Sequence, residues 1–134
     1  MSIITRSRLA LALFATFLLA SAPGLASAGP KAYVGNFKDN TVSVIDTVAE
    51  KVVATIPVAA GPHGIVISPD GRWVYVCGDG SSAVSVIDTL TDSVARTIEV
   101  GKGPHGNRLT ADGKILLVAV NGEDRIAFVD TATP

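Results

Sequence analysis

The chain has 134 residues, of which 48% are hydrophobic and 17% charged, and its formal net charge is −1. This length suits one domain. The near-neutral charge balance excludes a nucleic-acid-binding module, which would carry clustered Lys and Arg, and the apolar content excludes a disordered acidic chain.

The first 28 residues have the three parts of a secretory signal peptide. Arg6 and Arg8 supply positive charge, residues 9–20 form an apolar run, and Ala26-Ser27-Ala28 is a small-x-small cleavage site. An apolar run of about a dozen residues is too short to span a bilayer as a helix. An uncleaved N-terminal anchor is the alternative. We therefore expect cleavage after Ala28, and a mature chain 29–134 in the periplasm or secreted, without membrane attachment.

Short apolar runs rich in Val, Ile and Thr follow, and residues of these types favour strands. Turn residues such as Pro69-Asp70-Gly71 and Asp88-Thr89 separate the runs. No helical periodicity appears after residue 28. The clearest predicted strands are, in chain order, residues 32–36, 64–68, 73–77, 83–87 and 94–100.

A repeat of 42 residues organises these strands. Tyr33-Val34 recurs as Tyr75-Val76, VSVIDT at 42–47 recurs at 84–89, and GPHG at 61–64 recurs at 103–106. A diverged third copy continues in phase. Four strands in a repeat of about 40–45 residues are typical of a β-propeller blade, whose strands are lettered a to d from the inside. The sequence thus predicts an all-β propeller of four-stranded blades.

About two and a half such blades are present. Residues 32–58 would form strands b–d of one blade, 62–100 a full blade, and 104–131 strands a–c of the next. Since a closed propeller needs at least about four blades, we expect an incomplete ring and a truncated piece of a longer propeller. Ring closure by oligomerisation would leave each junction without two strands. The open blade faces nevertheless predict self-association.

The motifs YVGN (33–36), YVCG (75–78), TVSVIDT (41–47), KVVATIPV (51–58) and SPDG (68–71) resemble the YVTN-repeat family of bacterial, WD40-like β-propellers. The likeness covers nearly all of residues 31–134. Residues 31–47 are similar to members associated with PQQ-dependent alcohol oxidation. The family also resembles seven-bladed lactonases, although no lactonase constellation is found in this sequence.

His63 and His105 are the two histidines, and they occupy the same position of the repeat, just before the innermost strand. Loops that join strand d to the next strand a lie near the channel of a propeller, so both imidazoles would face one funnel. One interpretation is a metal or redox-cofactor site completed by further blades of a full-length parent. The other is a turn whose histidine packs locally, because two ligands without a carboxylate do not close a zinc site.

The loops between strands b and c should share that face, and they vary more than the strands, as recognition loops do. Ordinary solvated loops are the alternative. Their candidate binding residues are Lys38, Asp39, Asp79, Ser81, Glu123, Asp124 and Arg125.

The remaining distinctive side chains predict structural roles. Cys77 lies in an apolar run and should be a buried hydrophobe rather than a reactive or intermolecular thiol. Asp46, Asp88 and Asp130 recur at strand ends, where turn capping is favoured over a ring of carboxylates. Trp73 should pack beside its turn.

No catalytic motif and no cofactor are evident, which favours a non-enzyme. We expect an exported binding or scaffold module for a protein or small-molecule ligand that the sequence does not identify. The alternatives are a lactonase-like or redox-associated enzyme or metal protein whose site needs other blades, and a fragment without a function of its own.

Overall fold

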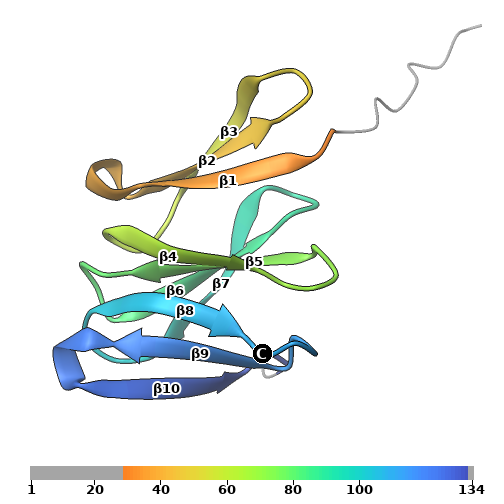
Figure 1. The fold of residues 1–134 in the computed structure, drawn as a ribbon. Coiled ribbons are helices and arrows are strands. Elements are labelled where there is room, and N and C mark those ends of the chain that lie inside the picture. The colour runs from red at the N-terminus through yellow and green to blue at the C-terminus, as the bar shows by residue number, and fades with distance from the viewer. Residues whose placement is uncertain (1–28, 133–134) are drawn as a thin grey trace, which may run out of the picture.

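The computed structural model describes residues 29–132, so the predicted signal peptide over residues 1–28 lies outside the described residues. Ten strands and two single 3-10 turns make up this part of the chain (Figure 1). No helix within residues 29–132 is long and apolar enough to cross a membrane. The elements are β1 (Lys31–Asn36), η1 (Phe37–Asp39), β2 (Thr41–Asp46), β3 (Lys51–Pro57), β4 (Pro62–Ile67), β5 (Trp73–Gly78), β6 (Ala83–Asp88), β7 (Ser93–Glu99), β8 (Pro104–Leu109), β9 (Ile115–Val120), η2 (Asn121–Glu123) and β10 (Arg125–Asp130).

The strands form three antiparallel sheets that lie one upon another (Figure 1). The first sheet has the order β1-β2-β3, the central sheet β4-β5-β6-β7, and the last sheet β8-β9-β10. These are strands b–d, a–d and a–c of three successive blades. The predicted all-β fold, an incomplete propeller with one full blade, is confirmed.

One boundary of the innermost strand differs from the prediction. The GPHG motif does not precede the strand: Pro62 and Pro104 begin β4 and β8, and the histidines lie inside them. Proline is tolerated as the first residue of a strand because its missing N–H is not needed there. The pairing with the neighbouring strand shifts just after each proline, between Pro62 and Ile65 and between Pro104 and Asn107.

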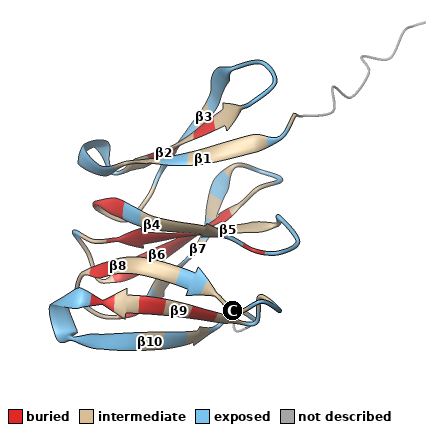
Figure 2. Cartoon of the chain, in the orientation of Figure 1, coloured by how far each residue is buried: buried red, intermediate tan, exposed pale blue. Residues whose placement is uncertain are grey.

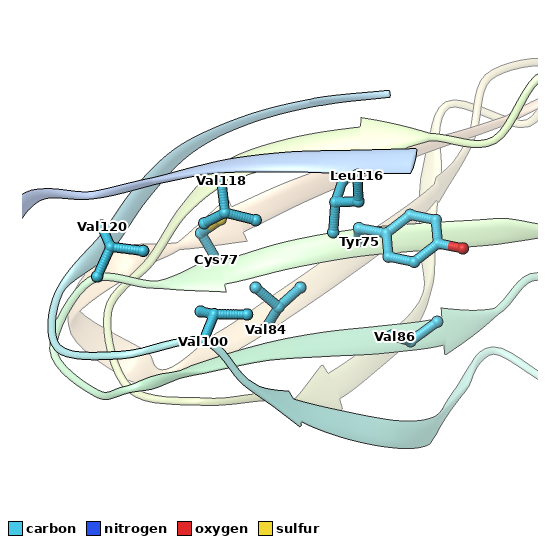
Figure 3. Packing of buried hydrophobic residues seen from close by; sticks show 8 residues of the cluster. All are labelled: Tyr75, Cys77, Val84, Val86, Val100, Leu116, Val118 and Val120. Carbon is cyan, nitrogen blue, oxygen red and sulfur yellow. The ribbon is translucent and has the colours of Figure 1, made fainter. Parts of the chain in front are cut away.

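Each junction between sheets holds its own hydrophobic core (Figure 2). In β5, Val74 and Val76 pack toward the first sheet, whereas Tyr75 and Cys77 pack toward the last. The alternation of side chains along a strand sends neighbours to opposite faces. Figure 3 shows the core of the second junction, built from Tyr75, Cys77, Val84, Val86, Val100, Leu116, Val118 and Val120. Burial on both faces explains why the central strands are almost uniformly apolar.

The repeated aspartates at strand ends cap turns, as predicted. Asp46 Oδ1 accepts from the backbone N–H of Val48 and of Ala49, each at 2.9 Å. In the same way, Asp88 Oδ1 accepts a hydrogen bond from the backbone N–H of Leu90 at 2.8 Å, and Asp130 Oδ1 accepts one from that of Ala132 at 2.9 Å. Local capping of this kind holds each hairpin closed without help from another sheet.

Candidate functional site

The loops at one edge of the sheets are joined to one another by backbone hydrogen bonds. The loop between strands b and c of a blade pairs with the connection that enters the same blade. In the central blade the N–H of Asp79 donates to Gly61 O at 2.9 Å, and in the last blade the N–H of Asn121 donates to Gly103 O at 3.0 Å. We call this edge the loop face; it lies at the left of Figure 1.

The two histidines meet across the junction between the central and last sheets. The rings of His63 in β4 and His105 in β8 are stacked, with 3.7 Å between their centroids and 29° between their planes. Phe37, from η1 of the first sheet, meets His63 edge to face at 6.4 Å. Three blades therefore contribute to one short row of rings, which includes both histidines singled out in the sequence.

A carboxylate lies beside one of these imidazoles. Asp79 Oδ1 is 3.3 Å from His105 Nδ1, and the two side chains are 32% and 41% exposed. When the imidazole is neutral and Nδ1 donates to Asp79, Nε2 is left as the acceptor. In many metal sites, a histidine binds the metal through one ring nitrogen and donates the N–H of the other to a carboxylate, which fixes the orientation of the ring. In that tautomer, Nε2 of His105 carries the lone pair that binds a cation.

The stacked geometry limits joint metal binding by the two rings. The lone pair of an imidazole nitrogen lies in the plane of the ring. The lone pairs of two stacked rings therefore run side by side and do not converge on one metal ion, which each nitrogen would have to approach to about 2.1 Å. Within residues 29–132 no group of three or more His, Cys, Asp or Glu side chains is placed to hold a metal. A shared site at His63 and His105 stays a prediction that would need these rings to reorient.

An open hollow of about 780 Å³ lies between the loops of the central and last blades. Two of the predicted residues, Asp79 and Ser81, line it, and so do Ser82, Lys102 and Asn121. Asp79 therefore links the imidazole row to the hollow. The hydroxyl of Ser81 donates to Gly78 O at 2.7 Å, and that of Ser82 donates to Glu99 Oε2 at 2.6 Å.

The other predicted loop residues lie on the same face but outside this hollow. Lys38 and Asp39 are exposed in η1. Glu123 accepts from the N–H of Lys102 at 2.8 Å and from Arg125 Nε at 2.7 Å, and these bonds lower the pKa of its carboxyl. Asp124 adopts a left-handed backbone conformation that ends η2. The structure thus gives Glu123, Asp124 and Arg125 roles in shaping their own loop.

Sequence reasoning missed two residues near the row of rings. Nothing in the sequence marks Phe37 as a site residue, because its contact with His63 forms between two different blades. Asn107 replaces an isoleucine of the preceding repeat, Ile65, and this difference was visible in the sequence. Its Nδ2 donates to Tyr75 O at 3.1 Å, while its Oδ1 is buried without a partner.

Comparisons with known proteins agree with this architecture. The model of a family described as YNCE-like beta-propeller matches residues 20–112. Hydrazine synthase of Kuenenia stuttgartiensis is 31% identical, with 78% of this chain and 30% of that chain covered and a TM-score of 0.72. The dihydro-heme d1 dehydrogenase NirN is 25% identical, with 73% and 21% covered and a TM-score of 0.64.

A third similar structure supports the fold alone. The β-propeller domain of Cps50 (Swd1) from Myceliophteria thermophila is 19% identical, with 78% of this chain and 33% of that chain covered and a TM-score of 0.68. The chain spans a third or less of the length of each of these three structures. No curated protein sequence matches the chain.

Proposed function

Because the chain belongs to the YNCE-like β-propeller family, we propose that it is an exported binding module whose loop face receives a protein or small-molecule ligand. The signal-peptide pattern supports export to the periplasm or the outside of the cell. The quoted motifs support the finer assignment to YVTN-type propellers, including an association with PQQ-dependent oxidation. The low charge supports a partner other than nucleic acid or a membrane surface.

One observation carries this proposal: the loop face gathers the hollow, the row of rings and polar side chains from several blades. Asp79 belongs both to the hollow and to the contact with His105. Concave surfaces with a few convergent polar groups are the usual places for ligands. The strands behind these loops are packed in the two cores and hold the loops in place. Loops positioned by a packed scaffold are common recognition surfaces.

The bonding of the Ser81 hydroxyl favours binding over nucleophilic catalysis in the hollow. A catalytic serine gives its proton to a base within hydrogen-bond distance. Ser81 instead donates to the carbonyl oxygen of Gly78, which is not a base, whereas Ser82 donates to the exposed carboxylate of Glu99. The imidazole of His105 faces Asp79 and His63. We therefore assign the hollow a role in recognition.

Site-directed photo-crosslinking in the source organism tests the proposal with four matched lysines. A photoreactive amino acid replaces Lys38 or Lys102, which are exposed on the loop face, or Lys51 or Lys114, which are exposed near the opposite edge. We expect defined adducts from Lys38 and Lys102 and none from the two controls. Adducts that are equal at both edges, or confined to the controls, contradict the proposal, as does the absence of any adduct.

A second candidate function is binding of a metal or redox cofactor, and the Asp79–His105 contact favours it. Two similar structures are named as enzymes, a hydrazine synthase and a dihydro-heme d1 dehydrogenase. In this reading His105 Nε2 is a ligand, and lactonase-like or redox chemistry would need groups from other blades.

Titration of the full chain with Zn²⁺, followed by the imidazole NMR signals, tests the second candidate. We expect the His105 signals to shift and the His105→Asn variant to lose the binding. Asp79→Asn should weaken binding by about tenfold or more, as losses of orienting carboxylates do. His63→Asn is the control that keeps this pair intact. Unshifted His105 signals, or equal affinity in Asp79→Asn, would exclude this candidate.

A further inference from the structure

In the central blade, an ion pair closes the corner where strand b begins and strand c ends. Arg72 lies just before β5, and its Nη1 donates to Oδ1 of Asp88 at the end of β6. This bond is the largest cause that lowers the pKa of the Asp88 carboxyl. The corner therefore places a cation from the start of strand b on the carboxylate that ends strand c.

The first blade builds the same corner without that cation. Position 30, one repeat before Arg72, is a proline and carries no charge. The N–H of Thr47 donates to Pro30 O at 3.0 Å. In the central blade, the N–H of Thr89 donates to Arg72 O at 3.1 Å in the same way. The backbone of the corner is therefore repeated, but the side chain at position 30 cannot pair with Asp46.

The backbone nitrogen of Gly29 lies at this corner. Lys31 and Asp46 are directly opposed in the pairing of β1 with β2, which brings the start of β1 beside the turn after β2 (Figure 1). A Cβ at Gly29 would be 2.8 Å from Asp46 Oδ1. The N–H groups of Ala49 and Val48, and then that of Gly29, donate to the Asp46 carboxylate and lower its pKa. Residue 29 thus holds its nitrogen within hydrogen-bond distance of a carboxylate.

Cleavage after Ala28, which the signal-peptide pattern predicts, would turn this nitrogen into the N-terminus of the mature chain. Hydrolysis breaks the bond between the carbonyl carbon of Ala28 and the nitrogen of Gly29. The hydroxyl of the water goes to the carbon and its proton goes to the nitrogen. An α-amine has an ordinary pKa of about 7.7–8.0, so it is mainly an ammonium at neutral pH. We propose that this ammonium pairs with Asp46 and gives the first blade the cation that Arg72 gives the central blade.

The pairing depends on export, which belongs to the proposed function, and makes the stability of the first blade depend on processing. In the precursor, residue 29 has a neutral amide. After cleavage, the same nitrogen carries a positive charge while its hydrogen bond to Asp46 is kept. Hydrogen bonds between an ammonium and a carboxylate are stronger than those of a neutral amide. Removal of the signal peptide therefore completes the corner of the first blade.

The groups around this corner leave Asp46 as the partner of the ammonium. Asp92 of the central sheet already accepts from Lys31 Nζ at 2.6 Å and from the hydroxyl of Tyr33 at 2.7 Å. Lys51, opposite Asp46 on β3, is exposed. The titratable groups of the first sheet at this corner are Lys31, Tyr33, Asp46, Glu50 and Lys51. The residues of the central sheet that line a hollow together with Gly29 are uncharged: Ile67, Gly71, Thr89 and Leu90.

The experiment expresses the full 134-residue chain in a bacterium, with its glycines labelled with ¹³C, and purifies it from the whole culture. Intact mass should show a chain that begins at Gly29. NMR then follows the α-carbon of Gly29 through a pH titration. We expect the ammonium to lose its proton at a higher pH in the wild type than in Asp46→Asn, by about half a pH unit at this partly exposed site, a threefold change in proton affinity. Asparagine keeps an oxygen that accepts from the turn N–H groups and removes only the charge.

Asp88→Asn is the matched control, because it removes the charge from the equivalent corner of the central blade and should leave the titration of Gly29 unchanged. Stability gives a second readout. A carboxylate that raises the pKa of the folded ammonium stabilises the fold below the unfolded pKa, and this gain is lost as the pH rises through the folded pKa. The urea midpoint of the wild type should therefore fall more between about pH 7 and 9.5 than that of Asp46→Asn.

The possible outcomes separate the ion pair from export. A chain that begins at Gly29 but titrates equally in the wild type and in Asp46→Asn overturns the ion pair and leaves export standing. A chain that begins at another residue also overturns the ion pair, and one that keeps all 134 residues overturns export as well. If circular dichroism shows that Asp46→Asn does not fold, Asp46→Ser removes the charge and keeps a turn-capping oxygen.

Discussion

At the residue scale, one carboxylate ties the first sheet to the central sheet. Asp92, in the turn between β6 and β7, accepts from the hydroxyl of Tyr33 at 2.7 Å and from Lys31 Nζ at 2.6 Å. Burial, then the bond to Asp92, raises the pKa of Tyr33 far above its usual value. Tyr33 packs against the first core as the equivalent Tyr75 lies in the second, but the hydroxyl of Tyr33 bonds to Asp92 whereas that of Tyr75 has Arg96 beside it.

Removing the Tyr33 hydroxyl should weaken the first junction. We expect Tyr33→Phe to lower the free energy of unfolding by about 1 kcal/mol, because a hydrogen bond to a charged group is lost at a partly exposed site. Urea unfolding measures the change. The double variant Tyr33→Phe/Asp92→Asn should cost less than the sum of the two single changes, and strictly additive losses would contradict the contact.

Cys77 is the residue whose predicted burial the structure confirms most directly. It is 0% exposed, and burial raises the pKa of its thiol to about 12. Since the thiolate is the reactive form, we expect the native protein to resist a chromogenic disulfide reagent near neutral pH and to react fully in denaturant. Cys77→Ala should show no signal in either condition. Rapid labelling of the native protein would contradict the placement.

At the scale of elements, the innermost strands β4 and β8 approach each other closely at a glycine. A Cβ at Gly64 would lie 2.5 Å from the backbone oxygen of His105, whereas a Cβ at Gly106 would meet nothing within 4 Å. Both glycines belong to GPHG. The repeat therefore keeps a glycine at both positions, although within the described residues only the first faces a neighbouring innermost strand.

The two glycines form a matched pair for mutation. Gly64→Ala should lower the free energy of unfolding by about 1–3 kcal/mol, because backbone rather than a flexible side chain must move. Gly106→Ala should be neutral or slightly stabilising, since alanine loses less conformational freedom in a strand than glycine. Urea unfolding of both variants gives the comparison, and equal effects would contradict the packing of β4 on β8.

At the scale of the whole molecule, hairpin carboxylates link stability to acid pH. Hydrogen bonds lower the pKa of Asp70 and Asp112, chiefly from the hydroxyls of Ser68 and Thr110 and then from backbone N–H groups. The backbone N–H groups of Ala49 and Val48 lower the pKa of Asp46. The guanidinium of Arg72 lowers that of Asp88. Asp70 and Asp112 are exposed, so solvent limits their contributions, whereas Asp46 and Asp88 are half-buried.

The sign of this linkage gives a pH prediction. A carboxyl with a lowered folded pKa stabilises the fold above its unfolded value, 3.8 for aspartate, and the gain is lost as the pH falls through the folded pKa. We therefore expect the free energy of unfolding to be level near neutrality and to decline below about pH 4. Urea midpoints across this range measure it. Asp70→Asn/Asp112→Asn should flatten the decline, and an unchanged slope would contradict the assignment.

The candidate site was predictable only in part. The shared position of His63 and His105 in the repeat placed both near one junction. Their stacking at 3.7 Å, the contact of Asp79 with His105 and the edge of Phe37 on His63 all join different strands or blades. A repeat shows which residues are equivalent, but the distance between equivalent residues depends on how the sheets twist and pack.

The sequence by itself determined the strands, their grouping into blades and the capped turns, because alternation, β propensity and Asp or Gly turn chemistry act between near neighbours. Only the tertiary structure decided which equivalent side chains are buried. Val76 is in a core while Val34 is exposed, and Val86 is in a core while Phe128 is exposed. The sequence pattern is the same at both members of each pair. Burial differs because, among residues 29–132, a covering sheet lies over one member of each pair and over the other none does.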